Sequence, residues 1–333
     1  MIPGSGSIKN LTFSEGEIDP PKENELQIEV KAVGLNFADI FAIQGLYSAT
    51  PRGSFIPGLE YAGIVTFAGK NVELFQPGDR VMGVTKFGAY TTHLNIEERY
   101  LTHLPNDWSF EEGAAYPVQA LTAYYSLVEL GALKEGQTVL IHSAAGGVGL
   151  LANRIAKKMG AYTIGVVGSS SKLGMLKKEG YDLGMVRSKH FREELRTLLD
   201  DRPLHIVLEC IGGHIFMDSY LNLSPEGRLI TYGSAHYSQS GNRPNFIKLF
   251  LKYINRPLLD PQKMIEQNKS VMGFNLIWLY EQSEKMQRIL KELKALDMDK
   301  PYVGHEFEFK DMIKAIKLFQ TGQTMGKVIV KVG

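Results

Sequence analysis

The sequence predicts an α/β protein with two domains, one rich in β-structure and one built on a doubly wound parallel sheet. Three observations support this class. At 333 residues, the chain is longer than a typical single domain. Short strand-like runs and turn residues fill the chain up to about residue 115, with little helical periodicity. From residue 120 onward, strand-like and helix-like segments alternate, as in a sheet with crossover helices.

The β-rich region is expected to consist of hairpins and bulges. Its strand-like runs include residues 26–34 and 61–69, and a turn is expected at Pro77-Gly78-Asp79. Turn residues of this kind end strands and reverse the chain, so several short paired strands are predicted here.

The second region supplies the parallel sheet and a tail. Four strands separated by helix-like segments are predicted at 138–142, 162–167, 205–210 and 228–232. The tail predicts two amphipathic helices at 280–296 and 311–319 and a closing strand at 327–332. Because the closing strand has no obvious place in the parallel sheet, we expect it to return to the first domain.

Composition excludes several kinds of partner. Lysine and arginine number 37 and aspartate and glutamate 36, so the net charge of +1 gives no electrostatic reason to expect nucleic acid or an anionic membrane. No apolar run approaches the ~20 residues of a membrane helix, and no signal-peptide core is present, so we expect no membrane insertion. The single cysteine, Cys210, excludes an intramolecular disulfide. We therefore expect a cytoplasmic protein.

The most informative motif is VLIHSAAGGVG, a buried strand followed by a glycine-rich turn and the start of a helix. Ala144, Gly146 and Gly149 occupy the three small positions of a dinucleotide fingerprint, with alanine in place of the first glycine. Gly147 and Val148 lie between them, where the helix N-terminus offers unpaired N–H groups to a pyrophosphate. We predict that these five residues bind a dinucleotide.

The end of the second strand favours NADPH over NADH. An NAD site usually carries a carboxylate about 20 residues after the glycine turn, but this chain has Gly168, Ser169, Ser170 and Lys172 there. Hydroxyls, a lysine and backbone amides suit a 2′-phosphate because they donate hydrogen bonds and one adds charge. Arg187 is expected to add a guanidinium near the adenosine. The alternative is a serine-rich loop with a helix-capping serine and a solvated lysine.

Several motifs together resemble the medium-chain dehydrogenase/reductase superfamily. They include GLNFADIFAIQGLY at 34–47, IPGLEYAGIV at 56–65, PGDRVMG at 77–83, FEEGAAYPVQALTAYYSL at 110–127 and NKSVMGFNLIWL at 268–279. Within the superfamily, the chain is most similar to the zinc-free quinone oxidoreductases, in particular their VAT-1-like branch. The resemblance implies a GroES-like, partly β-barrel catalytic domain of residues 1–117 and 260–333, with a Rossmann domain of residues 118–259 inserted between.

The same resemblance shows which metal ligands the sequence lacks. Zinc-dependent alcohol dehydrogenases carry a cysteine where this chain has Asn36 and a histidine where it has Leu59. An amide and an isobutyl group cannot replace a thiolate and an imidazole as zinc ligands, so we expect no metal site. Asp39 and Glu60 are not assigned as acid or base, and Glu60 is expected to pair with an arginine or to cap backbone amides.

Without a metal, the resemblance implies direct hydride transfer from NADPH to an electron-poor acceptor. It implies that Asn36 and Tyr47 donate hydrogen bonds to the substrate oxygen. Each has a structural alternative: a turn asparagine that bonds its own backbone, and an aromatic wall residue.

Further cofactor contacts are also carried over from the family. Thr122 matches a position beside the nicotinamide ribose and carboxamide, and Gly233 a position where the chain passes the nicotinamide. Phe274 and Asn275 lie in a segment that gives backbone contacts to the nicotinamide in relatives. Without the resemblance, Phe274 would be assigned to the core.

The predicted function is therefore a zinc-independent, NADPH-dependent reductase of quinones, enones or enals. Two alternatives stay open: an enoyl-thioester reductase, and an NADPH-binding regulatory protein with little turnover. The resemblance also implies a homodimer formed by pairing of Rossmann sheet edges, for which we expect residues 228–234 to serve as the edge strand.

Overall fold

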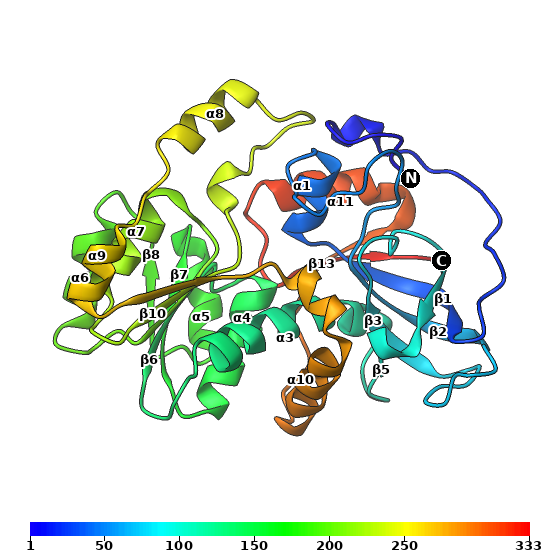
Figure 1. Ribbon diagram of the computed structural model, residues 1–333, viewed down its shortest axis with the longest axis horizontal. Helices are drawn as coiled ribbons and strands as arrows, with labels where there is room; N and C mark the ends of the chain where they lie inside the picture. The colour runs from blue at the N-terminus through cyan, green and yellow to red at the C-terminus, as the bar shows by residue number, and fades with distance from the viewer.

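Two β-sheets organise the chain into two lobes, and the computed structural model describes all residues from 1 to 333 (Figure 1). The seven-stranded sheet takes its strands from both ends of the chain, and the six-stranded sheet takes its strands from the middle. A mixed sheet thus lies beside a parallel sheet covered by helices, which confirms the predicted α/β class.

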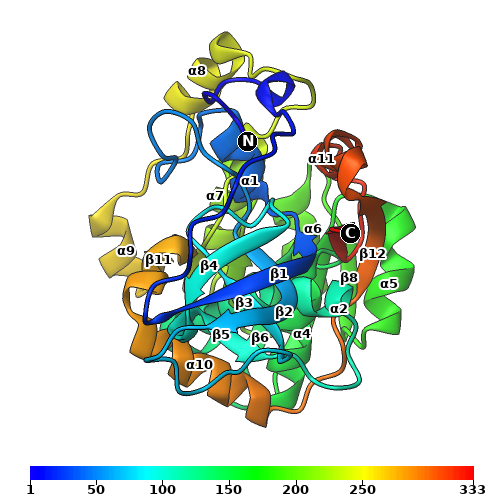
Figure 2. The ribbon, with the colours of Figure 1, turned by 90° about the vertical axis from the view of Figure 1, so that its right-hand side faces the viewer.

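The first sheet is built around its longest strand, β1. Its strand order is β12-β13-β1-β2-β3-β5, and β4 also pairs with β1 (Figure 2). Half-buried and buried residues alternate along most of β1, so one face of this strand packs on the core. Its pairing with β2 contains two register shifts, in agreement with the expected bulges. The strands are β1 (Glu25–Gly34), β2 (Glu60–Ala68), β3 (Arg80–Val84), β4 (His93–Glu97), β5 (Leu101–His103), β12 (Val303–Glu308) and β13 (Lys327–Lys331).

The closing strand β13 returns to the first sheet, as expected. It pairs antiparallel with β1, placing Ala32 opposite Lys331 and Gly34 opposite Ile329. Its other neighbour is β12, to which it is parallel. The residue before β13, Gly326, donates its N–H to the carbonyl oxygen of Ala145 at 2.8 Å. The start of β13 therefore joins the first lobe to the second.

The second sheet is parallel throughout. The four predicted strands are present, and each falls within two residues of its predicted bounds. Two strands of four residues were not predicted, because neither has the fully buried pattern of the central strands. In sheet order the strands are β11 (Ser270–Gly273), β10 (Arg228–Thr231), β9 (Ile206–Glu209), β6 (Thr138–His142), β7 (Tyr162–Val167) and β8 (Leu183–Val186).

Strand β11 corrects two expectations. It pairs with β10 along that strand's whole length, so residues 228–231 lie inside the sheet and not at its edge. It also places residues 270–273 in the Rossmann sheet, whereas the family resemblance implied that residues 260–333 belong to the first domain. After β10 the chain makes one more crossover, through α8 and α9, before it enters β11. The sequence pattern does not predict this crossover because α9 and β11 are short and have no buried residues.

Helices cover both faces of the parallel sheet. Along β6, Val139 and Ile141 belong to one hydrophobic cluster, and Leu140 belongs to another on the opposite face. The first cluster includes residues of α3, α4 and α10, and the second includes residues of α6 and α7. The helices are α1 (Phe37–Ile43), α2 (Phe110–Ala114), α3 (Pro117–Tyr124), α4 (Gly147–Lys158), α5 (Leu173–Lys178), α6 (Phe191–Leu199), α7 (Gly213–Asn222), α8 (Phe246–Ile254), α9 (Pro261–Gln267), α10 (Ser283–Ala295) and α11 (Met312–Gln320).

Both amphipathic helices of the tail are present. α10 begins at Ser283 rather than at residue 280, because a 3-10 segment, Leu276–Glu281, precedes it. α8 differs from the other long helices, because none of its residues is buried. Both views show α8 away from the two sheets (Figures 1 and 2). None of the helices combines the length and the apolar character needed to cross a membrane.

Candidate functional site

A cavity of about 1190 Å³ lies between the two lobes. It is bordered by residues at the carboxyl ends of β6, β7 and β10, where ligands of open α/β sheets bind. The predicted site residues line this cavity, except for Ala144, Ser169 and Ser170. Ala144 is fully buried beneath the glycine turn. The structure therefore brings together residues from most of the predicted positions, although they come from both lobes.

The glycine turn has a backbone shape that suits a pyrophosphate. α4 begins at Gly147, and its N-cap, Gly146, offers no side-chain cap, so the first N–H groups are available to a ligand. A Cβ atom at Gly149 would lie 2.6 Å from the carbonyl oxygen of Ser143, so only glycine allows this close approach of helix and strand. Val148 lines the cavity beside these glycines.

In the second turn, Ser169 and Lys172 have structural roles. The Ser169 side chain accepts a hydrogen bond from the Ser171 N–H and caps the 3-10 turn, which is the alternative considered for this serine. The Lys172 ammonium donates to the carbonyl oxygens of Gly322 and Thr324 at 2.7 and 2.8 Å. Lys172 therefore ties the second lobe to the segment before β13, and two of its three N–H groups are engaged.

Arg187 is the less restricted cation at this end of the cavity. Its Nη1 atom is buried and has no hydrogen-bond partner. A Cβ atom at Gly168 would lie 2.9 Å from its Nη2, so this glycine leaves room for the guanidinium. Burial lowers the pKa of Arg187 from its ordinary value. An anionic ligand would relieve the cost of this unpartnered charge.

At the other end of the cavity, Tyr47 and Asn275 bond each other across the two lobes. The Tyr47 hydroxyl donates to the Asn275 side-chain oxygen at 2.6 Å. Burial raises the pKa of Tyr47 to about 12, so the hydroxyl is protonated at neutral pH. The family resemblance implies only a backbone contact from Asn275, whereas its side chain also bonds the Tyr47 hydroxyl and Asn275 lines the cavity.

Three more predicted residues lie nearby and make mainly packing or backbone contacts. Phe274 packs its ring against Tyr125 at 4.9 Å between centroids. The Thr122 hydroxyl donates to the Val118 carbonyl oxygen one helical turn earlier, at 2.7 Å. Gly233 faces Cys210, since a Cβ atom at Gly233 would lie 3.1 Å from the Cys210 Cβ. These residues shape the cavity around Tyr47.

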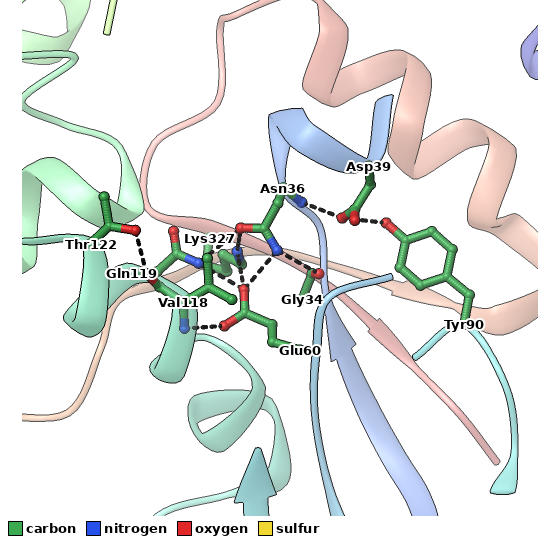
Figure 3. Close-up of polar contacts among 9 residues, drawn as sticks. All are labelled: Gly34, Asn36, Asp39, Glu60, Tyr90, Val118, Gln119, Thr122 and Lys327. Carbon is green, nitrogen blue, oxygen red and sulfur yellow. Dashed lines mark hydrogen bonds and ion pairs between the residues drawn. The ribbon is translucent and has the colours of Figure 1, made fainter. Parts of the chain in front are cut away.

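Asn36 lies in a buried polar network (Figure 3). Its side-chain oxygen accepts hydrogen bonds from Lys327 Nζ at 2.9 Å and from Gln119 Nε2 at 3.1 Å. Its amide nitrogen donates to Glu60 Oε1 at 2.9 Å and to the Gly34 carbonyl oxygen at 3.4 Å. Both amide hydrogens are thus directed at protein acceptors, and Asn36 is held in place by all of its polar atoms.

Glu60 is the centre of this network and is fully buried. Its carboxylate accepts hydrogen bonds from Lys327 Nζ at 2.5 Å, Gln119 Nε2 at 2.7 Å and the Val118 N–H at 2.9 Å. The expected backbone amide is present, but the cation is a lysine and not an arginine. Burial lowers the pKa of Lys327, while the adjacent Glu60 carboxylate opposes this shift. The two side chains form a buried ion pair.

Asp39 lies behind Asn36 and does not line the cavity. Its Oδ2 accepts hydrogen bonds from the Asn36 N–H at 2.7 Å and from the Tyr90 hydroxyl at 2.9 Å, and its Oδ1 has no partner. Burial raises the pKa of Asp39 to about 7. This carboxyl therefore titrates near neutral pH while it caps the start of α1.

The side chains around Asn36 do not suit a zinc ion. Asn36 and Leu59 line the cavity, and the neighbouring cation is the Lys327 ammonium, which would repel a metal. No group of three or more histidine, cysteine, aspartate or glutamate side chains is placed to hold a metal ion.

Sequence reasoning missed three residues of the site. Lys327 and Gln119 complete the network around Glu60. The Tyr181 hydroxyl lies 2.7 Å from the Gly149 carbonyl oxygen and 3.2 Å from that of Ala144, which fixes the glycine turn. A lysine opening a buried strand and a glutamine inside an apolar helix were the available signals. Nothing local in the sequence pairs them with Glu60.

Two family models match the chain. The alcohol dehydrogenase GroES-like domain matches residues 22–106, and the zinc-binding dehydrogenase model matches residues 147–295. The human synaptic vesicle membrane protein VAT-1 homolog is 31% identical over 339 residues, which cover 100% of this chain and 86% of that protein. The Danio rerio homolog is 31% identical over 313 residues, and these cover 93% of this chain but only 64% of that protein's length.

Solved structures share the same architecture. Escherichia coli quinone oxidoreductase complexed with NADPH superposes with a TM-score of 0.84 at 27% identity, covering 99% of this chain and 98% of that one. The CurK enoyl reductase gives a TM-score of 0.85 at 27% identity, covering 100% and 98%. The fold and the cavity thus define an oxidoreductase. The chain belongs to the medium-chain dehydrogenase/reductase family, within its zinc-free, quinone oxidoreductase-like group that includes the VAT-1 homologs.

Proposed function

We propose that the chain is a zinc-independent, NADPH-dependent reductase of quinones or α,β-unsaturated carbonyl compounds. The observation that carries this proposal is the meeting of three groups in one cavity: an uncapped helix N-terminus at Gly147, the unpartnered Arg187 guanidinium and the protonated Tyr47 hydroxyl. The first two groups suit the phosphates of a dinucleotide, and the third suits an oxygen that gains negative charge.

Arg187 supports NADPH as the cofactor. A guanidinium binds a phosphate through two parallel hydrogen bonds, and the buried Nη1 of Arg187 has no protein partner that competes. No acidic residue lines the cavity to bind the free ribose hydroxyls of NADH. The similar Escherichia coli structure contains NADPH, which agrees with this choice.

Bound NADPH supplies a hydride to the electron-poor carbon of the acceptor. Tyr47 stabilises the product-like state by donating its hydroxyl hydrogen to the acceptor oxygen, which replaces the Asn275 side-chain oxygen as its hydrogen-bond partner. Asn275 keeps the phenol directed into the cavity before the acceptor binds. One proton from solvent, passed directly or through Tyr47, completes the two-electron reduction.

Asn36 has a positioning role in this proposal. Both of its amide hydrogens are engaged, so a substrate oxygen would have to break a bond within the network to accept one. Its side-chain oxygen holds the Lys327 ammonium at the cavity wall, beside the Gly326 backbone that meets the glycine turn. Asn36 therefore fixes the junction between the two lobes at the point where cofactor and acceptor meet.

Steady-state oxidation of NADPH, followed at 340 nm, tests the function. We expect turnover with 9,10-phenanthrenequinone or with a simple enone, and a kcat that falls about 10- to 1000-fold in Tyr47→Phe. Tyr162→Phe is the matched control. Tyr162 is the first residue of β7 and does not line the cavity, so this variant should keep the wild-type kcat. An unchanged kcat in Tyr47→Phe would contradict the tyrosine's role. Absence of NADPH oxidation with every acceptor would contradict the reductase itself.

A second candidate function is reduction of an enoyl thioester. The likeness to the CurK enoyl reductase favours it, since the two chains superpose over their whole length. Crotonyl thioesters decide between the candidates, because an enoyl-thioester reductase turns them over with a higher kcat/KM than free enones. Tight NADPH binding without turnover of any acceptor would favour a regulatory role.

We also propose that the chain forms a homodimer through β11. This strand pairs only with β10, so its outer N–H and C=O groups are unpaired. In a twofold-symmetric dimer, β11 of one copy would pair antiparallel with β11 of the other, and these N–H and C=O groups would form hydrogen bonds. Sedimentation equilibrium tests the dimer, and Val271→Pro, which removes an N–H from the strand, is expected to shift it toward monomer.

A further inference from the structure

α8 lines one side of the cavity although it packs against neither sheet. Phe246, Leu249, Phe250 and Tyr253 belong to the cavity wall. Yet 63% of the Phe250 surface and 66% of the Phe246 surface are exposed. Large aromatic side chains in water carry a free-energy cost unless something covers them. These residues share a continuous cavity with Tyr47 and the glycine turn, so a ligand bound there would reach them.

The opposite wall of this part of the cavity is also aromatic. Phe37 and Phe41 come from α1, and Phe319 comes from α11. The Phe37 ring lies 4.5 Å from the Phe319 ring and 6.4 Å from the Phe41 ring, measured between centroids. Figure 1 shows α8 on one side, with α1 and α11 on the other. We call the part of the cavity between α8 and these two helices the aromatic arm.

The aromatic arm carries no charge. The charged residues that line the whole cavity are Lys172, Arg187 and Lys327. Lys172 and Arg187 belong to the second turn and the segment after β8, and Lys327 is paired with Glu60. No charged residue of α1, α8 or α11 lines the cavity. The arm therefore offers nothing to a phosphate or a carboxylate and favours an apolar group.

We propose that the aromatic arm binds an extended apolar chain of the hydride acceptor. The preferred substrates are then electron-poor carbonyl compounds with a long alkyl or polyprenyl tail. The inference rests on the proposed reductase function and specifies its substrate class. The cavity of about 1190 Å³ includes the aromatic arm as well as Tyr47 and the glycine turn, so an acceptor beside Tyr47 has a continuous path into the arm.

A chain-length series measures this preference. We expect kcat/KM for trans-2-alkenals, compared from five to twelve carbons, to rise about two- to fourfold for each added methylene until the arm is filled. Phe250→Ser and Phe41→Ser, which remove aromatic rings from the two walls, should flatten this rise, so that kcat/KM falls more for the twelve-carbon alkenal than for the five-carbon alkenal. Circular dichroism verifies that each variant is folded.

Ile247→Ser is the matched control for Phe250→Ser. Ile247 also lies on α8 and is 75% exposed, but it does not line the cavity. It should leave the chain-length dependence unchanged. A rise that survives both Phe250→Ser and Phe41→Ser would overturn the aromatic arm as the chain-binding site.

Other outcomes separate this inference from the proposed function. If short alkenals are reduced but kcat/KM does not depend on chain length, the inference fails and the reductase function stands. If no alkenal or quinone is reduced, both fail. If Phe250→Ser and Ile247→Ser both dissociate an oligomer while the chain-length dependence is unchanged, a second copy of the chain covers α8, and the inference is overturned.

Discussion

The glycine turn and the Glu60 network both border the same cavity, but they are built in different ways. The turn is one continuous segment whose shape depends on small residues and backbone N–H groups. The network joins side chains from the N-cap of α1, β2, α3 and β13, with Lys327 and Asn36 separated by 291 positions. The comparison shows that a backbone site tolerates little added bulk, whereas a buried ionic site depends on every partner being present.

The largest expected effect comes from breaking the network at Glu60. Glu60→Gln leaves the Lys327 ammonium buried without its counter-ion, which should lower the free energy of unfolding by about 3 to 5 kcal/mol. Urea denaturation measures this loss. Glu306→Gln breaks the half-exposed pair with Lys331 and serves as the control, with little expected loss because solvent screens this pair.

A second substitution tests whether the loss arises from charge. Combining Glu60→Gln with Lys327→Met removes both charges, so part of the lost stability should return. If the double variant is no more stable than Glu60→Gln alone, the unpaired ammonium is not the cause.

The matching test of the glycine turn adds one methyl group. In Gly149→Ala, the new Cβ would lie 2.6 Å from the Ser143 carbonyl oxygen, so helix and strand must separate. We expect about 1 to 3 kcal/mol of destabilisation and weaker NADPH binding. Gly174→Ala, where nothing lies within 4 Å, is the control and should leave both quantities unchanged or slightly improved. Equal NADPH affinity in the two variants would contradict the close-packing role.

Arg187 extends the comparison between the glycine turn and the Glu60 network, because it is a charged side chain in the same cavity as the glycine turn. Arg187→Ala should weaken NADPH binding about 10- to 100-fold, since it removes charge-assisted hydrogen bonds to the 2′-phosphate. The affinity for NADH, which lacks this phosphate, should change little. Arg196→Ala, at an exposed position of α6, is the control. Isothermal titration with both cofactors measures the ratio, and an equal loss for NADH would remove Arg187 from 2′-phosphate recognition.

The smallest expected effect concerns Asp39, at the border of the network. Burial raises its pKa to about 7 in the folded chain, against about 4 when unfolded. Between these values the folded chain binds the proton more tightly, so this carboxyl makes stability fall as pH rises from 4 to 7. Asp39→Asn should flatten this decline between pH 5 and 7.5, measured by urea denaturation at a series of pH values. The same pH dependence in both proteins would contradict the raised pKa.

The fold was largely predictable from the sequence, because its main signals are local. Four of the six parallel strands, the glycine turn and the returning strand β13 follow from apolar runs and small residues in continuous segments. β8 and β11 are largely exposed or half-buried, so no buried apolar run marks them in the sequence. Their place in the sheet depends on what lies beside them, which the sequence alone does not reveal. The edge strand and the domain boundary were wrong for this reason.

The site was predictable to a smaller extent. Small residues of the turn lie where expected, because backbone shape requires them. The polar partners differ from expectation: Lys172 bonds two carbonyl oxygens, Asn36 uses both amide hydrogens within the network, and Glu60 pairs with a lysine. Apart from the bond from Asn36 to the Gly34 carbonyl oxygen two residues earlier, each of these bonds joins segments distant in the chain. Only the three-dimensional arrangement decides which partner each side chain has.

The central claim is that this cavity transfers a hydride directly from NADPH to an electron-poor acceptor without a metal. The most direct measurement uses NADPH carrying deuterium at C4 of the nicotinamide, in its two stereoisomeric forms, with an enone as acceptor. We predict that deuterium from one stereoisomer appears at the β-carbon of the reduced product, detected by mass spectrometry and NMR. Product without deuterium from either stereoisomer, or no product at all, would contradict the account.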